Sequence, residues 1–326
     1  MKNFIARALL LGLATLGLAF SVQAWDETGH KITAYIAWQR MTPATRERVI
    51  KILTSAAEDS QLATFYASYG SRTLESRQRE FFMLASTWPD IVRDRNFEIR
   101  YKKYHHGNWH YSDTFWKVVD GKPELLPKSA EGGLAVEKLI DFDKIARDTS
   151  ATDAEKALAI SWLEHLIGDI HQPLHASGRV TDLEPKGDQG GNLFSLTPKD
   201  TPRDKQENLH WFWDSIIARN LPNKKDACDT DYIDPIAKKI IAKYPFDKMQ
   251  SRLDLANFDD WRKESYEIAS TKVYPPELKR GETPSEKYRK GALKIAQERL
   301  ALAGYRMGEL FNQVFGAAGP VGSPTR

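Results

Sequence analysis

Residues 152–175 read TDAEKALAISWLEHLIGDIHQPLH, and this stretch predicts a long, largely apolar helix. Thr152 and Glu155 form a capping box, because each side chain can bind the other residue's free backbone N–H. The helix is expected to run through Ile170 and to end before Pro173, which cannot continue the backbone hydrogen bonds. The histidines and aspartates of this stretch therefore lie on one apolar helix or just beyond its end.

The same start signals predict helices elsewhere. Thr42-Pro43 supplies a cap and a first-turn proline before a helix over 43–55. Thr283-Pro284-Ser285-Glu286 begins a helix to about Phe315, whose apolar residues recur every three or four positions. Further helices are expected near residues 29–40, 75–94, 132–147, 207–219, 232–243 and 257–272.

Strand signals are scarce. Asn108–Thr114 is the best extended candidate, and the polar stretch 177–206, with GDQGGN in its middle, is the longest loop. No internal repeat or change of composition marks a linker between domains. The fold class is therefore mainly α, with a single helical domain over residues 25–316. A signal peptide over 1–24 precedes it and a flexible tail over 317–326 follows it.

Residues 1–24 fit an export signal in three parts. Lys2 and Arg7 precede an apolar run over 8–20, and Val22 and Ala24 satisfy the small-residue rule before a cleavage site. The alternative is a membrane anchor, but the run is short against the roughly 20 residues that span a bilayer. Cleavage after Ala24 would leave a soluble, exported protein without a membrane span.

The net charge and the cysteine content limit the possible binding partners and the cellular location of the protein. The formal net charge of +3 falls to +1 when the leader is removed, because Lys2 and Arg7 leave and the leader carries no acidic residue. That value is too small to predict nucleic-acid binding, so attraction for a polyanion needs a local feature. Cys228 is the only cysteine, which excludes an internal disulfide. With no N-x-[ST] glycosylation acceptor, this favours a bacterial protein, periplasmic or secreted.

Two of the 8 histidines are followed four residues later by an aspartate: His165 by Asp169 and His210 by Asp214. Residues at this spacing lie on one helical face, and imidazole with carboxylate is a ligand set that suits zinc. One such pair alone is read more simply as a surface hydrogen bond, but two pairs on apolar helices favour metal binding. His171 faces away from the first pair, whereas Pro173 can redirect His175.

Three other positions have two interpretations each. Asp90, in STWPDIVR, is either a helix cap or a functional carboxylate, and Arg93 is its salt-bridge partner or a phosphate clamp. His110, in NWHYSD, is a core histidine or a ligand. Trp25 would begin the mature chain, where its free amine and carbonyl could chelate a metal five residues from His30.

Taken in order, the motifs resemble those of the zinc-dependent, single-strand-specific nucleases of the S1/P1 type. The set comprises Trp25 with a histidine five residues on, WxD, WHYxD, HxxxDxHQPLH, a GGN loop and HxxWD, and it extends to Asp214. Each motif is weak alone, but the ordered set is specific. The resemblance implies a mainly α fold with a trinuclear zinc cleft, of the phospholipase C/nuclease P1 type.

The resemblance also implies the ligands of three Zn²⁺ ions. The first would be held by Asp90, His110, His165 and Asp169. The second would take the Trp25 amine and carbonyl, His30 and Asp169 as a bridging carboxylate. The third would use His175, His210 and Asp214. His105, His106 and His171 remain outside these sets.

By the same resemblance, the protein would be an endonuclease that cleaves single-stranded DNA and RNA to 5′-phosphates, with 3′-nucleotidase activity as a further expectation. Asp90 would orient the attacking water, Arg93 would stabilise the charge that develops on phosphorus, and the third zinc would stabilise the departing oxygen. Nucleic acids and nucleotides would be the only partners of a monomer.

The resemblance further places substrate-binding residues. Tyr111 would stack on a base, Asp113 would hydrogen-bond the edge of that base, and Asn192 of the GGN loop would line the same cleft. Their simpler interpretations are an aromatic core residue, an aspartate in a turn and a tight glycine turn.

The chain differs from the family pattern at two points, and two other functions are alternatives to the nuclease. Family members usually begin Trp-Gly, whereas Asp26 follows Trp25 here, and the disulfides of fungal relatives are missing. The alternative functions are those of a zinc-dependent phospholipase C and of a non-catalytic periplasmic zinc-binding protein. The first differs in the spacing of its initial histidine, and the second would need neither Arg93 nor a base pocket.

Overall fold

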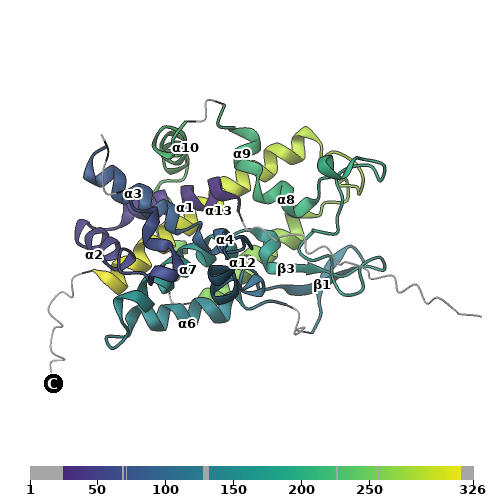
Figure 1. Ribbon diagram of the computed structural model, residues 1–326. Helices are drawn as coiled ribbons and strands as arrows, with labels where there is room; N and C mark the ends of the chain where they lie inside the picture. Colours follow the sequence, from purple (N-terminus) through teal and green to yellow (C-terminus); the bar gives the residue numbers. More distant parts are fainter. Residues whose placement is uncertain are drawn as a thin grey trace, which may run out of the picture.

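The computed structural model describes residues 25–67, 70, 72–127, 132–224, 227–255 and 257–316. The expected leader (1–24) and tail (317–326) lie outside the described residues. Helices form most of the body, and a small sheet projects at one side (Figure 1). The prediction of a mainly α fold is confirmed.

The α-helices have these bounds: α1 Glu27–Arg40, α2 Pro43–Leu53, α3 Leu74–Ala85, α4 Trp88–Ile91, α5 Glu98–Tyr104, α6 Ala135–Arg147, α7 Asp153–Ile170, α8 Leu209–Asp214, α9 Ile216–Asn220, α10 Asp229–Lys243, α11 Phe246–Met249, α12 Phe258–Ile268 and α13 Glu286–Phe315. The strands are β1 Thr114–Val119, β2 Lys122–Leu125 and β3 Ser177–Arg179. Short 3₁₀ turns join them, including η3 Gly107–Trp109 and η4 Pro173–Ala176.

Helix α7 lies inside the molecule. It begins at the predicted capping box, in which Thr152 Oγ1 accepts from the Glu155 N–H at 3.2 Å and Glu155 Oε2 accepts from the Thr152 N–H at 2.8 Å. Every residue from Ala159 to Ile170 is buried, because α1, α2, α6 and α13 pack around the helix. A helix enclosed in this way holds its polar side chains in a rigid, dry environment.

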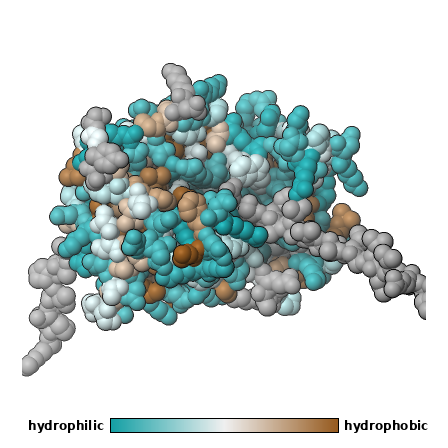
Figure 2. All heavy atoms as spheres, in the orientation of Figure 1, coloured by the Kyte–Doolittle hydropathy of each residue, from teal (hydrophilic) through white to brown (hydrophobic). Residues whose placement is uncertain are grey.

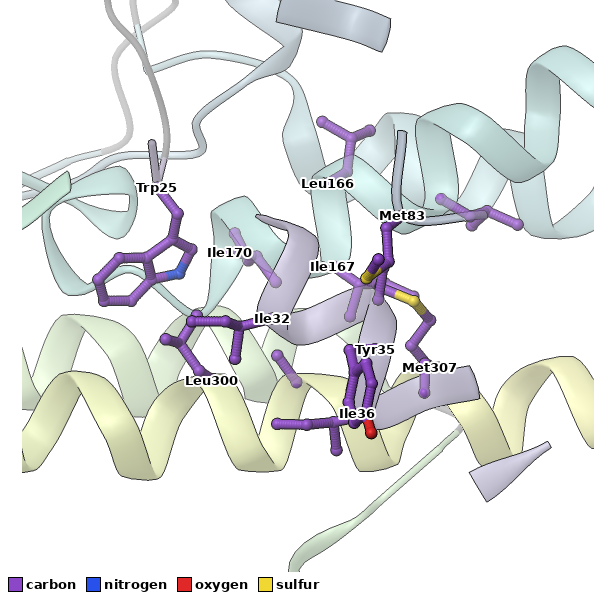
Figure 3. Close-up of a cluster of buried hydrophobic side chains, with 14 of the residues drawn as sticks. Trp25, Ile32, Tyr35, Ile36, Met83, Leu166, Ile167, Ile170, Leu300 and Met307 are labelled. Atoms are coloured by element: carbon purple, nitrogen blue, oxygen red, sulfur yellow. The ribbon is translucent and has the colours of Figure 1, made fainter. Parts of the chain in front are cut away.

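Helices α1 and α13 pack closely along much of their length. A Cβ atom on Gly304 would stand 2.6 Å from Ile36 Cβ, and one on Gly308 would stand 2.7 Å from Arg40 Cβ, so these glycines allow the two backbones to approach. Figure 3 shows the resulting core, with Trp25 at one end of α1 beside α13. This contact holds α1 against α13, and the N-terminal end of α1 enters the site described below.

A buried ionic network joins α12 and α13 to the end of α7. Arg299 and Arg306 are almost fully buried, and both donate to Glu264 Oε2, at 2.7 and 2.8 Å. Arg306 also reaches Nε2 of His171 at 2.7 Å, and the His171 Nδ1 lies 2.7 Å from the Ile167 carbonyl. His171 therefore faces away from Asp169, as predicted from its position on the helix.

The sheet has the order β2-β1-β3. Strands β1 and β2 are antiparallel and are joined by a turn at Asp120 and Gly121, which have φ of 49° and 74°. Strand β3 pairs in parallel with β1, and the Ser112 N–H donates to the His175 carbonyl at 2.9 Å. The segment after α7 therefore runs beside the segment that precedes β1.

Several sequence-based boundaries were wrong. Asn108–Thr114 is not a strand: its start overlaps η3, and the strand begins only at Thr114, where β2 and β3 supply backbone partners. The helix expected over 75–94 ends at Ala85 and resumes as α4, and the helix expected over 207–219 is divided into α8 and α9. The other predicted helices are present within a few residues of their expected bounds.

Candidate metal centre

Helix α7 places His165 and Asp169 one turn apart, with both side chains fully buried. His110 approaches them after η3, with Nδ1 2.9 Å from His165 Nε2 and 3.2 Å from Asp169 Oδ2. Asp90, in α4, places Oδ1 3.7 Å from His165 Nε2 and 3.9 Å from His110 Nδ1. The four residues expected to hold the first ion therefore converge from three parts of the chain.

His30 extends this cluster from α1. Its ring stacks on that of His165 with centroids 4.0 Å apart, and its Nε2 lies 3.2 Å from Asp169 Oδ1. The two oxygens of Asp169 face different imidazoles, since Oδ2 is close to His110 and His165. A carboxylate that joins two cations needs this arrangement.

Trp25 immediately precedes the N-cap of α1. Asp26 is the cap, because its side chain accepts a hydrogen bond from the Gly29 N–H at 3.0 Å. The residue before a cap and the fourth helical residue are neighbours in such a helix start, which brings Trp25 beside His30. The Trp25 indole is fully buried, and the Asp26 N–H donates to the Asp214 carbonyl at 3.0 Å.

A second cluster is formed by His175, from η4, and by His210 and Asp214, from α8. His210 Nε2 lies 3.3 Å from Asp214 Oδ2, and His175 Nε2 lies 3.8 Å from Asp214 Oδ1. Gln172 is fully buried beside them. Its side-chain amide donates to Asp214 Oδ1 at 2.6 Å, and its Oε1 accepts from the Leu174 N–H at 2.6 Å.

Three of the histidines share one kind of partner at Nδ1. The contacts are with backbone carbonyls: His165 with Ser86 at 2.8 Å, His175 with His110 at 2.6 Å, and His210 with Gly190 at 2.8 Å. A carbonyl only accepts, so the proton lies on Nδ1 and each Nε2 presents its lone pair to the cluster. Histidine ligands of metal ions are commonly oriented in this way.

The electrostatics of the first cluster also fit a cation. Burial lowers the pKa values of His30 and His165 far below the usual range, so both imidazoles are neutral. Burial raises the pKa of Asp169, with the Asp90 charge acting in the same direction, and burial likewise raises the pKa of Asp214. A nearby cation would favour the ionised carboxylates instead.

The donor atoms are available for a metal. Within the described part of the chain, His30 Nε2, Asp169 Oδ1 and Asp214 Oδ2 are buried and have no hydrogen-bond partner, and the buried Asp90 Oδ1 is paired with the Arg93 guanidinium at 2.8 Å. Groups of three ligand atoms, each within 4.8 Å of the others, form in three places: His30, Asp90 and His165; His110, His165 and Asp169; and His175, His210 and Asp214. Tetrahedral zinc ligands stand roughly 3.3 Å apart, so these residues fit zinc.

Arg93 lies beside the first cluster, where its guanidinium is 2.8 Å from Asp90 Oδ1. Its side chain is only 13 % exposed, and its nitrogens have no hydrogen-bond partner among the described residues apart from this ion pair. A guanidinium with unused donors is suited to bind phosphate oxygens, often through two parallel bonds.

A pocket of about 330 Å³ lies beside the second cluster. Its lining combines rings, polar groups and loop backbone: Tyr111, Asp113, Phe115, Leu174, Lys186, Gly187, Gln189, Gly190 and His210. Asn192 does not line this pocket, and its side-chain amide donates to the Gln189 carbonyl at 2.9 Å.

The histidines expected outside the clusters are also accounted for. His105 stacks on Tyr101 with centroids 4.9 Å apart, and His106 stacks on Trp109 at 3.6 Å. His171 belongs to the arginine network. None of the three joins the ligand groups formed by the described residues.

Sequence reasoning missed three residues at this site: Gln172, Phe115 and Lys186. Gln172 lies within HQPLH, so its position between two candidate ligands was a usable signal. Phe115 and Lys186 carried none, because only the pairing of β1 with β3 brings their segments together.

Comparison with known proteins gives a consistent result. The sequence model of the S1/P1 nuclease family matches residues 25–316. Endonuclease 1 of Arabidopsis thaliana is 25% identical to the chain, over 94% of the chain and 92% of the relative. Nuclease S1 of Aspergillus oryzae is 25% identical, over 67% and 61% respectively. Nuclease P1 of Penicillium citrinum is 22% identical, over 60% and 59%.

Proposed function

Because the chain belongs to the S1/P1 nuclease family and is a hydrolytic nuclease, we propose that it cleaves phosphodiester bonds of single-stranded DNA and RNA. The products would carry 5′-phosphates, and 3′-nucleotides would also be substrates. The observation that carries the proposal is the meeting of two His/Asp clusters with a largely enclosed arginine, Arg93, and a pocket of about 330 Å³.

Three zinc ions are the proposed cofactors. Asp90, His110, His165 and Asp169 would hold the first, and the Trp25 amine and carbonyl, His30 and Asp169 the second. His175, His210 and Asp214 would hold the third. Zinc bound here would act as a Lewis acid and lower the pKa of water, which gives a nucleophile at neutral pH.

Asp90 and Arg93 would act on the scissile phosphate. Asp90 Oδ1 lies at the cluster, 2.8 Å from the Arg93 guanidinium, and Asp90 would orient a proton of the attacking water. Its ion pair with Arg93 keeps the guanidinium at the cluster. Arg93 can then donate to the phosphate oxygens as negative charge accumulates on them.

The pocket supplies a reason for acting on single strands. A base must leave its stack to enter a pocket, and in a duplex this costs pairing energy as well. Tyr111 would stack on that base and Asp113 would accept hydrogen bonds from its edge. Asn192 would support the loop that carries Gln189 and Gly190.

Maturation would complete the site. Removal of a signal peptide over 1–24 would free the Trp25 amine beside His30 and export a single nuclease domain over 25–316, as a monomer, to the bacterial periplasm or medium. Among the described residues, no helix has the length and apolar character needed to cross a membrane. The space-filling view accordingly shows a mostly hydrophilic face with scattered apolar residues (Figure 2).

The proposal is tested with zinc-loaded protein that begins at Trp25. We expect cleavage of single-stranded DNA and RNA, slow cleavage of the matching duplex, and products that mass spectrometry identifies as 5′-phosphates. Asp169→Asn is the matched inactive control. Hydrolysis of phosphatidylcholine alone would show a phospholipase C instead, and bound zinc without hydrolysis would show a zinc-binding protein.

A further inference from the structure

One wall of the pocket comes from the long polar loop. Gly187 has φ of 94°, and a Cβ atom there would stand 2.9 Å from Phe115 Cε1, so the loop backbone lies against the Phe115 ring. The Gly187 N–H donates to the Glu184 carbonyl at 3.0 Å, which closes a turn with Lys186 inside it. This turn brings Lys186 to the pocket that Asp113 also lines.

The loop is held in place by buried polar contacts. Asp188 is fully buried, and its carboxylate accepts from the Arg179 N–H at 3.0 Å and from the Tyr274 hydroxyl at 2.6 Å. Glu184 is 8 % exposed and binds Arg280 at 2.8 Å. These two anchored carboxylates restrain the loop, so the backbone position of Lys186 is set by the fold.

Two polar groups of opposite character border the apolar part of the pocket. Asp113 presents a carboxylate, which has the Ser177 backbone N–H as one partner. Lys186 presents an exposed ammonium that makes no ion pair within the described part of the chain. Tyr111, Phe115 and Leu174 supply the apolar surface between which a flat ring can lie.

We propose that this pocket selects guanine, with Asp113 accepting from N1–H and the 2-amino group and Lys186 donating to O6. The proposal rests on the proposed nuclease function, since it names the base that the same pocket receives. Guanine is the base whose pairing edge has two adjacent donors beside an acceptor. On adenine, the ring N1 is an acceptor that would face the carboxylate, and the 6-amino group would face the ammonium.

The pyrimidine bases match the hydrogen-bonding groups of Asp113 and Lys186 less well than guanine does. Uracil and thymine have one donor between two acceptors, so one of them would face Asp113. Cytosine has a donor amino group but no adjacent ring N–H. Burial and the nearby Asp188 raise the pKa of Asp113, whereas the hydrogen bond from the Ser177 N–H and the donors of a bound guanine favour its ionised form.

The test measures kcat/KM on short single-stranded oligonucleotides that differ in one base beside the scissile phosphate. Guanine, inosine, 2-aminopurine and adenine are compared, in one series 5′ and in another 3′ of that phosphate. Inosine lacks only the 2-amino group, and 2-aminopurine lacks O6 and N1–H. We expect guanine to exceed adenine by about tenfold or more in one series, with inosine between them.

Lys186→Met keeps much of the side-chain stem and removes the donor. It should reduce the guanine-to-adenine ratio by about tenfold, whereas Asp113→Asn should abolish the difference between guanine and inosine. Lys199→Met, an exposed lysine outside the pocket, is the matched control and should keep the wild-type ratio. Zinc content and thermal unfolding verify that each variant is folded.

Two outcomes would overturn the proposal: equal rates on guanine and adenine in both series, or a wild-type ratio in Lys186→Met. Either result would leave the nuclease function intact, because cleavage itself would still be seen. A protein that cleaves none of the oligonucleotides would contradict the proposed function instead, so the two failures are distinguishable.

Discussion

The side-chain amide of Gln172 donates a 2.6 Å hydrogen bond to Oδ1 of Asp214, and this bond fixes the carboxylate that faces His210 and His175. Groups that orient metal ligands typically contribute 10–100-fold to affinity. Gln172→Leu should therefore weaken retention of one zinc ion by about this factor while the other two stay bound.

Zinc remaining after dialysis against increasing chelator measures this effect. Gln206→Leu is the matched control, because Gln206 is exposed and its side chain donates a hydrogen bond to the Thr201 carbonyl, away from both clusters. Equal zinc retention in Gln172→Leu and the wild type would show that Gln172 does not hold the ligand in place.

Arg93 is expected to act in turnover and not in metal binding. Arg93→Ala should keep all bound zinc and lower kcat by roughly 10²–10³, the typical loss for one donor to a developing charge. Arg95→Ala, an exposed arginine two residues on, should leave both quantities unchanged. Loss of zinc together with activity in Arg93→Ala would assign Arg93 a structural role.

The position of Trp25 just before α1 makes it possible to test whether its amine binds zinc. Protein that begins at Trp25 should bind one more zinc ion than protein with one extra residue before Trp25, because the amine beside His30 is then a peptide nitrogen. Metal analysis and activity on single-stranded DNA give the result. Full zinc content and rate in the extended protein would exclude the amine as a ligand.

Glu264 provides a pH-dependent contribution to stability. Although burial opposes it, hydrogen bonds and charges from Arg306 and Arg299 lower the pKa of Glu264 below the ordinary 4.5. A depressed carboxyl pKa gives stability that is present above pH 4.5 and is lost as pH falls through the folded-state value.

Glu264→Gln should therefore destabilise the protein by about 2–3 kcal/mol at pH 7, because two arginines stay buried without their charged partner. The difference from wild type should shrink toward pH 3. Urea unfolding of the zinc-loaded wild type and of Glu264→Gln, each at pH 7 and pH 3, measures this difference in unfolding free energy. Because the two proteins are compared at the same pH, effects of zinc release that they share cancel. A difference that is constant with pH would contradict the assignment.

The close packing of α1 on α13 predicts a pair of opposite glycine variants. Gly304→Ala should destabilise by about 1–3 kcal/mol, because its methyl group would meet Ile36. Gly291→Ala lies on the same helix in open space and should stabilise by up to about 1 kcal/mol. Urea unfolding compares them, and equal effects would show that α1 can shift to accept the added methyl group.

Local signals predicted most of the helices and four of the candidate ligands, His165, Asp169, His210 and Asp214, whereas Asp90 and His110 were assigned only through the family resemblance. The capping box at Thr152 and the four-residue spacing of His165 and Asp169 depend only on neighbours in sequence, so the chain alone was sufficient to place them. The GGN loop was likewise expected near the cleft, and the Gly190 carbonyl is found bonded to His210.

Strand β1 and the pocket residues Phe115 and Lys186 could not be placed from local sequence signals. Strand β1 forms because β2 and β3 supply partners, and β3 lies far along the chain. Asp120-Gly121 was a hairpin signal that would have moved the expected strand to its correct position. Lys186 reaches the pocket through the pairing of β1 with β3 and the contact of Phe115 with Gly187, and neither is predicted by a sequence pattern.

The position of the Asp169 carboxylate between two groups of histidines has a consequence for metal uptake. Its two oxygens face separate imidazole groups, so a cation taken up on either side would orient the same carboxylate for the other. Uptake of two ions on this carboxylate would therefore be cooperative, and because such linkage is reciprocal, each ion would raise the affinity for the other by the same factor. Asp214 belongs to the other cluster, so an ion held there would be expected to exchange independently.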